Sequence, residues 1–464
     1  MTDEEKQKAI FNAFEPNVPA TRYFYADCKE ARGDSNLVKK IIKRLRNAEN
    51  TNLHYLFTGH LGCGKSSELL HLAKIIKEKT TFFPIYIDFE KYLDVQDTTL
   101  EDIFLGMISE VVRQYKDKFE FNFKIENYTL FKQVIGFFGD FSVKGEIGLP
   151  FDIAKLNIEK LRQNPNLRQQ IREAINKDAR KSLLGELNLI IFEIEKNLKQ
   201  DTEFTKLIII ADSLEKIKRF EKDRILKESE KDRMLKEGEN AEDETASQKY
   251  LFLDKEEQLA GIVTNVIYTV PLFLYRSYGK QLTEAYGKNV FVLPMVKIHK
   301  RGKFDEPFEI GRKELIEIIN LRLKNKETLI NDVFEPDALE YLLKYSGGHI
   351  RSLIRFVQEA LLEVDELPIN FASARKSVRE EVRSFAASVR ENYWEKLAKL
   401  ELSANQQIEN GDEDYSKMLE SLAILEYVNG DDEERDDNVW YAVNPSIRLT
   451  IKFQEALKKL TPSE

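Results

Sequence analysis

One segment of eight residues, Gly59 to Ser66 (GHLGCGKS), constrains the fold of this chain more than any other feature. It matches the pattern G-x-x-x-x-G-K-[ST] and stands between an apolar run at 53–58 (LHYLFT) and a helical pattern at 66–79. Its glycines let backbone N–H groups turn inward around phosphate oxygens, and the following helix adds the positive end of its dipole. This strand–loop–helix setting predicts a phosphate-binding P-loop.

The loop predicts a nucleotide site that takes ATP and Mg²⁺. We expect the Lys65 ammonium to reach the β- and γ-phosphates and the Ser66 hydroxyl to ligate Mg²⁺. The residues predicted to bind the cofactor are Gly59, His60, Leu61, Gly62, Cys63, Gly64, Lys65, Ser66 and Ser67.

Four further apolar runs share the character of the one before the loop. They lie at 84–89, 207–211, 266–270 and 290–293. All are rich in β-branched and aromatic residues and lack polar alternation, as parallel strands buried on both faces do. Because helical patterns separate the runs, the predicted fold class is α/β.

Two acidic residues follow the 207–211 run. Asp212 ends this strand, where a P-loop fold needs a carboxylate to hold the water shell of Mg²⁺. Glu215 lies three residues further on and fits two roles. It is either a general base that polarises the attacking water or an acid favoured in the first turn of a helix.

Two more polar residues are candidates for the site. Thr269 ends the fourth strand and would either orient the attacking water or cap a β-strand. Arg351 follows a Gly-Gly pair in Gly347–Arg351 (GGHIR) and opens a helical pattern. It would either report the phosphates from a lid helix or lie on the surface.

Two segments exceed what a strand crossover needs. Between the second and third strands, 134–151 predicts a hairpin, and 153–199 predicts helices broken near Pro165. After the third strand, 221–229 (EKDRILKES) is nearly repeated at 230–238 (EKDRMLKEG). Its mixed charges suit either a solvated helical arm or an arm that binds a partner.

From residue 311 the pattern is helical, at 312–325, 336–345, 350–364 and after 374. A run at 416–428, an acidic turn and a run at 439–443 then predict a small winged-helix domain. The turn at 430–437 carries six acidic residues and one arginine, so its tip would be repelled by duplex DNA.

These motifs together resemble the AAA+ ATPases, specifically the branch that joins origin-recognition-type ATPases with bacterial STAND-type signalling ATPases. GHLGCGKS, LIIIADSLEK, VIYTVP and SGGHIRSLIRF carry the resemblance. The segment 22–33 (RYFYADCKEARG) looks like the stretch that lines the adenine pocket in that group.

The resemblance implies a five-stranded sheet of order 5-1-4-3-2, with the Walker B acid at Asp212, sensor 1 at Thr269 and sensor 2 at Arg351. It implies an N-terminal segment at 1–50, an ATPase core at 51–305 and a helical lid at 306–375. A winged-helix-like domain follows at 376–464, and insertions stand at about 115–200 and 218–250. An arginine finger is also implied, for which Arg276 and Arg301 are candidates.

Composition limits the setting of this site. Lys and Arg total 71 against 80 Asp and Glu, a formal net charge of −9, which excludes a uniformly basic nucleic-acid coat. The two cysteines, Cys28 and Cys63, form no disulfide framework or zinc pattern. The N-terminus lacks the pattern of a signal peptide, and the most apolar run, 261–275, is too short to span a bilayer. We expect a cytoplasmic protein without a membrane partner.

Three functions fit these features. The first is a slow AAA+/STAND-like ATPase whose nucleotide state drives self-assembly or signalling to a protein on a separate chain, with bacterial defence as one setting. The second is a DNA-associated ATPase of the initiator or transposition-regulator kind. The third is an adaptor that binds ATP without turnover. The basic cluster at 39–46 (KKIIKRLR) is either a phosphate contact or the solvated face of a helix.

Overall fold

The computed structural model describes residues 3–21, 23–33, 36–48, 51–120, 127–137, 159–176, 182–218, 244–324, 328–409, 411–430 and 438–461. Several predicted features lie outside these residues. They are most of the 134–151 hairpin, the nine-residue repeat at 221–238 and the acidic tip at 431–437.

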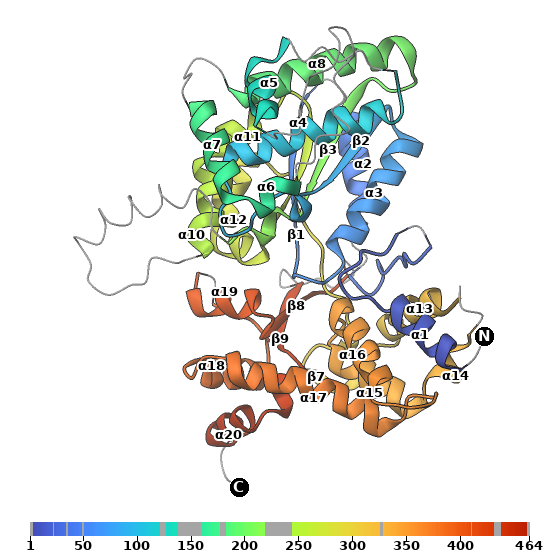
Figure 1. Cartoon of the computed structure of the whole chain (residues 1–464). Coiled ribbons are helices and arrows are strands. Elements are labelled where there is room, and N and C mark those ends of the chain that lie inside the picture. Colours follow the sequence, from blue (N-terminus) through green and yellow to red (C-terminus); the bar gives the residue numbers. More distant parts are fainter. Residues whose placement is uncertain are drawn as a thin grey trace, which may run out of the picture.

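A five-stranded parallel sheet forms the core of the molecule (Figure 1). Its strands are β1 (His54–Thr58), β2 (Phe82–Asp88), β3 (Lys206–Asp212), β4 (Asn265–Val270) and β5 (Val290–Val292). They pair in the order β2-β3-β4-β1-β5, which is the predicted order 5-1-4-3-2 listed from the opposite edge. The predicted α/β P-loop fold is confirmed.

Both faces of the sheet are buried, because successive strand residues enter different apolar clusters. Ile209 packs on one face with α4 (Leu100–Lys116), α8 (Leu183–Asp201) and α12 (Leu272–Tyr286). Its neighbours Ile208 and Ile210 pack on the other face with α2 (Leu37–Asn47) and α3 (Lys65–Lys79). The prediction that the continuous apolar runs are strands buried on both faces is therefore confirmed.

The segment between β2 and β3 is helical in its described parts. After η1 (Phe89–Lys91) and α4 come α5 (Thr129–Gly136), α6 (Glu159–Gln163), α7 (Pro165–Asn176) and α8. The predicted hairpin is wrong at its start, since Val134 and Ile135 complete α5. The buried residues of α5 stand at helical spacing, and their packing on one helix face outweighs their β propensity. They are Leu130, Phe131, Val134 and Ile135. The predicted break at Pro165 is confirmed, because this residue begins α7.

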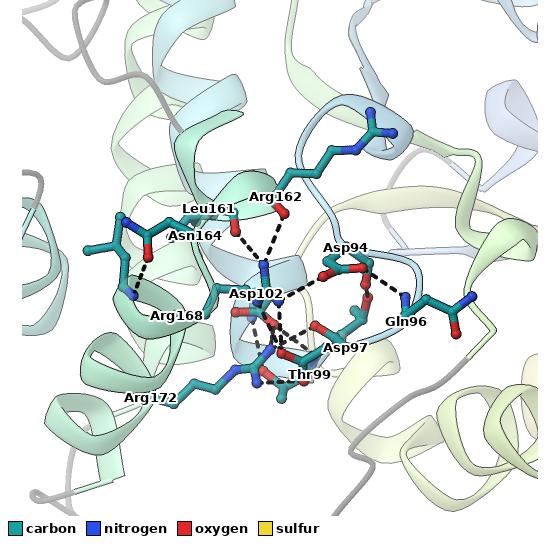
Figure 2. A network of polar contacts seen from close by, with 12 residues as sticks. Asp94, Gln96, Asp97, Thr99, Asp102, Leu161, Arg162, Asn164, Arg168 and Arg172 are labelled. Carbon is teal, nitrogen blue, oxygen red and sulfur yellow. Dashed lines mark hydrogen bonds and ion pairs between the residues drawn. The ribbon is translucent and has the colours of Figure 1, made fainter. Parts of the chain in front are cut away.

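Two arginines fix α7 to the loop before α4 (Figure 2). Arg168 binds Asp94 at 2.8 Å and Asp97 at 3.0 Å, and Arg172 binds Asp97 at 2.8 Å and Asp102 at 2.5 Å. Asp102 also belongs to the capping box of α4 with Thr99. The inserted helices are thus tied to the core by a partly buried network of charges.

Short elements connect β3 to β4 and β5 to the lid. They are η4 (Leu214–Lys216), α10 (Glu244–Lys249), η5 (Tyr250–Asp254), α11 (Glu256–Ala260), β6 (His299–Lys300) and β7 (Lys303–Pro307). The helical region that follows comprises α13 (Glu309–Lys324), α14 (Ile330–Val333), α15 (Pro336–Ser346), α16 (Ile350–Leu362) and α17 (Phe371–Ser388). The N-terminal helix α1 (Asp3–Ala13) packs into the same cluster through Ile10 and Phe14. Helix α17 is continuous across residue 375.

The C-terminal part comprises α18 (Tyr393–Leu402), α19 (Glu413–Glu420), an antiparallel pair of β8 (Ile424–Val428) and β9 (Val439–Val443), η6 (Ile447–Leu449) and α20 (Ile451–Leu460). Leu425, Tyr427 and Trp440 of this hairpin belong to the same apolar cluster as β1 and α3. The hairpin therefore packs directly on the P-loop side of the core, below β1 in Figure 1. Within the described residues, no helix combines the length and apolar character needed to cross a membrane.

Candidate nucleotide site

The loop at 59–64 has the backbone geometry that its glycines predict. Gly62 and Gly64 have φ values of 83° and 105°, in the region that L side chains rarely adopt. A Cβ atom at Gly62 would lie 2.5 Å from Nε2 of His349. Gly64 is the N-cap of α3, so the loop leads straight into the helix that starts at Lys65. This exposes helix N–H groups to a bound anion.

Lys65 is buried at the centre of the loop. Its Nζ atom donates to the carbonyl oxygens of Gly59 at 3.0 Å and His60 at 3.1 Å, and lies 3.1 Å from Oε1 of Glu215. Burial opposes the charge on Lys65, but attraction to Glu215 outweighs it and raises the pKa of the ammonium. Lys65 is therefore a cation whose protein partner is Glu215.

Asp212 ends β3 next to this pair, in register with Asp88 of β2. It accepts hydrogen bonds from the Tyr86 hydroxyl at 2.5 Å and from the Ser213 amide at 2.8 Å. Burial and repulsion by Glu215 raise the pKa of Asp212 to about 6, although bonds from Ser66 and Tyr86 partly offset them. Tyr86 is a site residue that sequence reasoning missed, because a tyrosine within a strand carries no local signal of a polar role.

A tight turn explains how Glu215 enters the site from three residues beyond Asp212. Ser213 adopts a left-handed conformation (φ 69°), and its hydroxyl donates to Oδ1 of Asp88 at 2.9 Å. The Leu214 amide donates to Oγ1 of Thr269 at 3.0 Å. The turn thereby points Glu215 back toward Lys65. Burial opposes ionisation of Glu215, but Lys65 and a hydrogen bond from Thr269 outweigh it and lower its pKa.

Thr269 lies on β4, between the P-loop strand and the Asp212 strand, as predicted. It is opposite Phe57 of β1, and it is fully buried. Its hydroxyl contacts the turn that carries Glu215. Thr269 is thus held in place by the acidic turn, whichever of its two predicted roles applies.

The helix α16 begins against the P-loop. The Arg351 amide donates to the Gly62 carbonyl at 3.2 Å, and Nε2 of His349 donates to the Leu61 carbonyl at 2.6 Å. The other ring nitrogen of His349 contacts the Ser352 hydroxyl at 2.8 Å. The Arg351 side chain lines the same pocket as Lys65. His349 stands inside the GGHIR motif, but its role in holding the loop was not predicted.

Lys65, Ser66, Glu215 and Arg351 line one pocket of about 1000 Å³, its open mouth included. Core residues form one wall, and the N-terminal segment and the lid form the other. The Ala20 amide donates to the Ser67 hydroxyl at 2.8 Å, so Ser67 holds the N-terminal segment at the pocket. Lining residues from that segment and the lid are Pro16, Asn17, Val18, Pro19, Ala20, Phe24, Tyr25, Ala26, Cys28, Arg32, Ile318, Arg322, Ile350, Arg351 and Ile354. Arg22 lies outside the described residues.

Arg32 is a second residue that sequence reasoning did not single out. Its guanidinium donates to the Cys63 carbonyl at 2.7 Å and to the Pro294 carbonyl. It is buried beside the P-loop. The segment 22–33 was predicted to line the pocket, but nothing in the pattern distinguishes Arg32 from its neighbours.

The His60 side chain does not face the pocket. Its Nε2 atom accepts a hydrogen bond from the Glu426 amide of β8 at 2.9 Å. Both oxygens of the Glu426 carboxylate accept from one edge of the Arg276 guanidinium of α12, with Nε to Oε2 at 2.6 Å and Nη2 to Oε1. Arg276, a candidate arginine finger, is therefore engaged within its own chain. The other candidate, Arg301, donates to the Asn405 carbonyl.

Two residues are predicted to hold Mg²⁺ at this site, Ser66 and Asp212. Among the described residues, no group of three or more His, Cys, Asp or Glu side chains is placed to hold a metal. Ser66 lines the pocket and its side chain contacts the buried Asp212, and Mg²⁺ ordinarily takes one or two protein ligands with the rest from water and phosphates. The donor set fits Mg²⁺ held jointly with a nucleotide.

No protein-family model and no curated protein sequence matches the chain. Similar solved structures include Cdc6p from Pyrobaculum aerophilum, at 13% identity and a TM-score of 0.38, covering 97% of this chain and 98% of that one. The ORC2 protein of Aeropyrum pernix, in ADPNP–ADP complexes, has 14% identity and a TM-score of 0.38, with coverage of 96% and 97%. The ORC1 protein of the same organism, in complex with DNA, has 12% identity and a TM-score of 0.37, with coverage of 97% and 96%. Similarities this distant say nothing about what this chain binds.

Proposed function

We propose that the chain binds ATP with Mg²⁺, hydrolyses it slowly, and acts as an AAA+ switch of the origin-recognition and STAND-like kind. The observation that carries the proposal is the convergence of Lys65, Asp212 and Glu215 at one P-loop, from the ends of two strands, β1 and β3, that β4 separates. Buried charges are costly unless they are paired or serve a ligand. A phosphate-binding loop with a cation and two carboxylates fits a nucleotide triphosphate.

The chain's own residues suggest how the site would work. Lys65 would exchange Glu215 for phosphate oxygens, which leaves the Glu215 carboxylate ionised and free to accept a proton from the attacking water. Thr269 would hold the turn that aims Glu215, and Arg351 would contact the phosphates from the lid. Ser66 and Asp212 would hold Mg²⁺, which supplies positive charge to the phosphate oxygens. Because Glu215 must first leave Lys65, slow turnover is expected.

The output of the switch is proposed to be self-assembly or a signal to a protein on a separate chain in the cytoplasm, with bacterial defence as one setting. The support is that lid and C-terminal hairpin both touch the P-loop, through Arg351 and through Glu426. A change in the loop on nucleotide binding would therefore reach both parts. The 376–464 region, proposed as winged-helix-like, would carry the signal.

Equilibrium binding of ATP in the presence of Mg²⁺ tests the proposal. Lys65→Ala should abolish binding, while Lys79→Ala, which changes an exposed lysine of the same helix, should leave it unchanged. Sizing the wild-type protein with and without ATP tests assembly. Failure of the wild-type chain to bind ATP would refute the proposal, and binding without turnover would favour the adaptor.

A DNA-associated ATPase is the second candidate. Four cations of α2 are exposed on the side opposite its buried Leu37, Ile41, Ile42 and Leu45, namely Lys39, Lys40, Lys43 and Arg46. Such a face could contact phosphates, although it also fits a solvated helix. Duplex binding that weakens steeply as salt increases, and less steeply in Lys39→Ala/Lys43→Ala, would favour this candidate.

A further inference from the structure

Arg322 is a buried arginine in the last turn of α13. Its side chain is 5% exposed, and within the described part of the chain no carboxylate pairs with it. Its Nη1 atom donates to the Ile318 carbonyl at 3.2 Å, one turn back on the same helix. Burial lowers the pKa of Arg322 to about 10. The protein therefore bears the cost of an uncompensated charge at this position.

Two other arginines with little exposure, one buried and one partly buried, have carboxylate partners, whereas the buried Arg32 donates to two backbone carbonyl oxygens. Arg168 contacts Asp94 and Asp97, and Arg276 contacts Glu426. A guanidinium has five N–H donors and no acceptor, so it seeks oxygen or ring-nitrogen acceptors. A ligand in the space that Arg322 lines could supply these acceptors.

That space is the nucleotide pocket. Arg322 lines it from the lid, together with Ile318 and Ile354. The groups suited to phosphates, Lys65 and Ser66, belong to the core wall. The lid wall is largely apolar, as expected where the flat base and the ribose of a nucleotide lie. Arg322 is a polar group of this wall that lies next to Ile318 and Ile354, whereas Arg351, the other lid arginine of the pocket, begins its helix against the P-loop.

We propose that Arg322 is a nucleotide-binding residue whose guanidinium donates hydrogen bonds to acceptors of the base and ribose. A purine offers ring nitrogens and a ribose offers hydroxyl oxygens as acceptors for these N–H groups. The proposal rests on the proposed function, because it names a further contact of the same site. It also assigns part of the binding to α13, which no motif of the sequence indicated.

The test compares wild type, Arg322→Met and the control Arg312→Met. Arg312 lies on the same helix, but it is paired with Glu309 and Glu340 and does not line the pocket. The dissociation constants of ATP, ADP and adenosine are measured by calorimetry, and the thermal midpoint is measured for nucleotide-free protein. A hydrogen bond from a charged group is typically worth a tenfold change in affinity or more.

Arg322→Met should raise all three dissociation constants by a similar factor of about ten, while raising the thermal midpoint of the nucleotide-free protein. A merely structural arginine would give the opposite, a lower midpoint and unchanged affinities. Arg312→Met should leave the affinities unchanged. If Arg322→Met does not fold, Arg322→Lys takes its place. Lysine keeps the charge but loses the planar guanidinium, so it should also raise the dissociation constants of ATP, ADP and adenosine.

Two results overturn this inference while leaving the proposed function intact. One is unchanged nucleotide affinity in Arg322→Met when the wild type binds ATP. The other is a loss confined to ATP and ADP with adenosine unaffected, which would place Arg322 at the phosphates. Failure of the wild type itself to bind ATP would instead refute the proposed function.

Discussion

The ammonium of Lys65 lies 3.1 Å from the carboxylate of Glu215, and both side chains are buried at the mouth of the P-loop. The pair joins the two groups that the proposed chemistry must separate. Lys65 has to turn to phosphate, and Glu215 has to turn to water. A bound nucleotide would therefore have to break this ion pair.

Glu215→Gln is expected to slow ATP turnover by at least about a hundredfold, because the amide cannot accept a proton from water. Binding should persist, so the variant should remain in its ATP-bound state. Single-turnover hydrolysis measures the effect. Glu90→Gln is the matched control, since Glu90 also lines the pocket but pairs with Lys216. Hydrolysis by Glu215→Gln at the wild-type rate would show that Glu215 is only the counterion of Lys65.

Arg276→Met is expected to destabilise the protein by about 3 kcal/mol, because it leaves the buried Glu426 carboxylate without its cation. Chemical denaturation measures the loss. The double variant Arg276→Met/Glu426→Met should recover part of it, since both charges are then removed.

The same variant tests whether Arg276 acts between subunits. Mixing Arg276→Met chains with Lys65→Ala chains would restore ATPase activity if Arg276 supplied an arginine finger to a neighbour. Because Arg276 is bound to Glu426 in its own chain, we expect no restoration. Recovered activity in the mixture would contradict the intrachain role.

Arg172→Met is expected to destabilise the inserted helices, because Asp102 is buried and would lose its cation. Burial raises the pKa of Asp102 even with Arg172 present, so its ionised form depends on that contact. The expected loss is about 3 kcal/mol in the free energy of unfolding. Arg162→Met is the control, because the exposed Arg162 side chain donates to the Glu90 carbonyl and, among the described contacts, pairs with none of Asp94, Asp97 and Asp102. Equal losses in the free energy of unfolding of both variants would show that the Arg172–Asp102 contact stabilises the protein no more than an exposed contact does.

Glu314 predicts a pH dependence of stability. Burial raises its pKa to about 7, although the Ala31 amide and Arg32 partly offset the effect. The folded protein therefore binds this proton more tightly than the unfolded chain does. The corresponding stability is complete below about pH 4.3, the ordinary value for glutamate, and is lost as pH rises through 7.

Glu314→Gln, which cannot ionise, should consequently lose less stability than wild type between pH 5.5 and pH 8. Urea midpoints at both pH values measure the difference. Glu317→Gln, an exposed site on the same helix, should follow the wild type. Parallel curves for wild type and Glu314→Gln would show that Glu314 ionises normally.

Local patterns predicted the strands, because apolar β-rich runs such as 207–211 can be buried only between two layers. They failed at residues 134–136, where apolar spacing fits a helix as well as a hairpin. The resemblance supplied the strand order and the position of Thr269 between β1 and β3. It did not supply His349 or Tyr86, because their contacts depend on side-chain directions that no motif encodes.

The sequence by itself determined the P-loop and its strand–helix setting, since a phosphate loop needs its glycines, lysine and serine at fixed spacing. Only the tertiary structure decided which charges are paired. The left-handed turn at Ser213 brings Glu215 to Lys65, and Glu426 binds Arg276 across 150 positions of the chain. Arg322 lines the pocket with Ile318 and Ile354, and no carboxylate among the described residues pairs with it. Pairing depends on distances of a few ångströms between remote segments, and these distances follow from packing rather than from spacing along the chain.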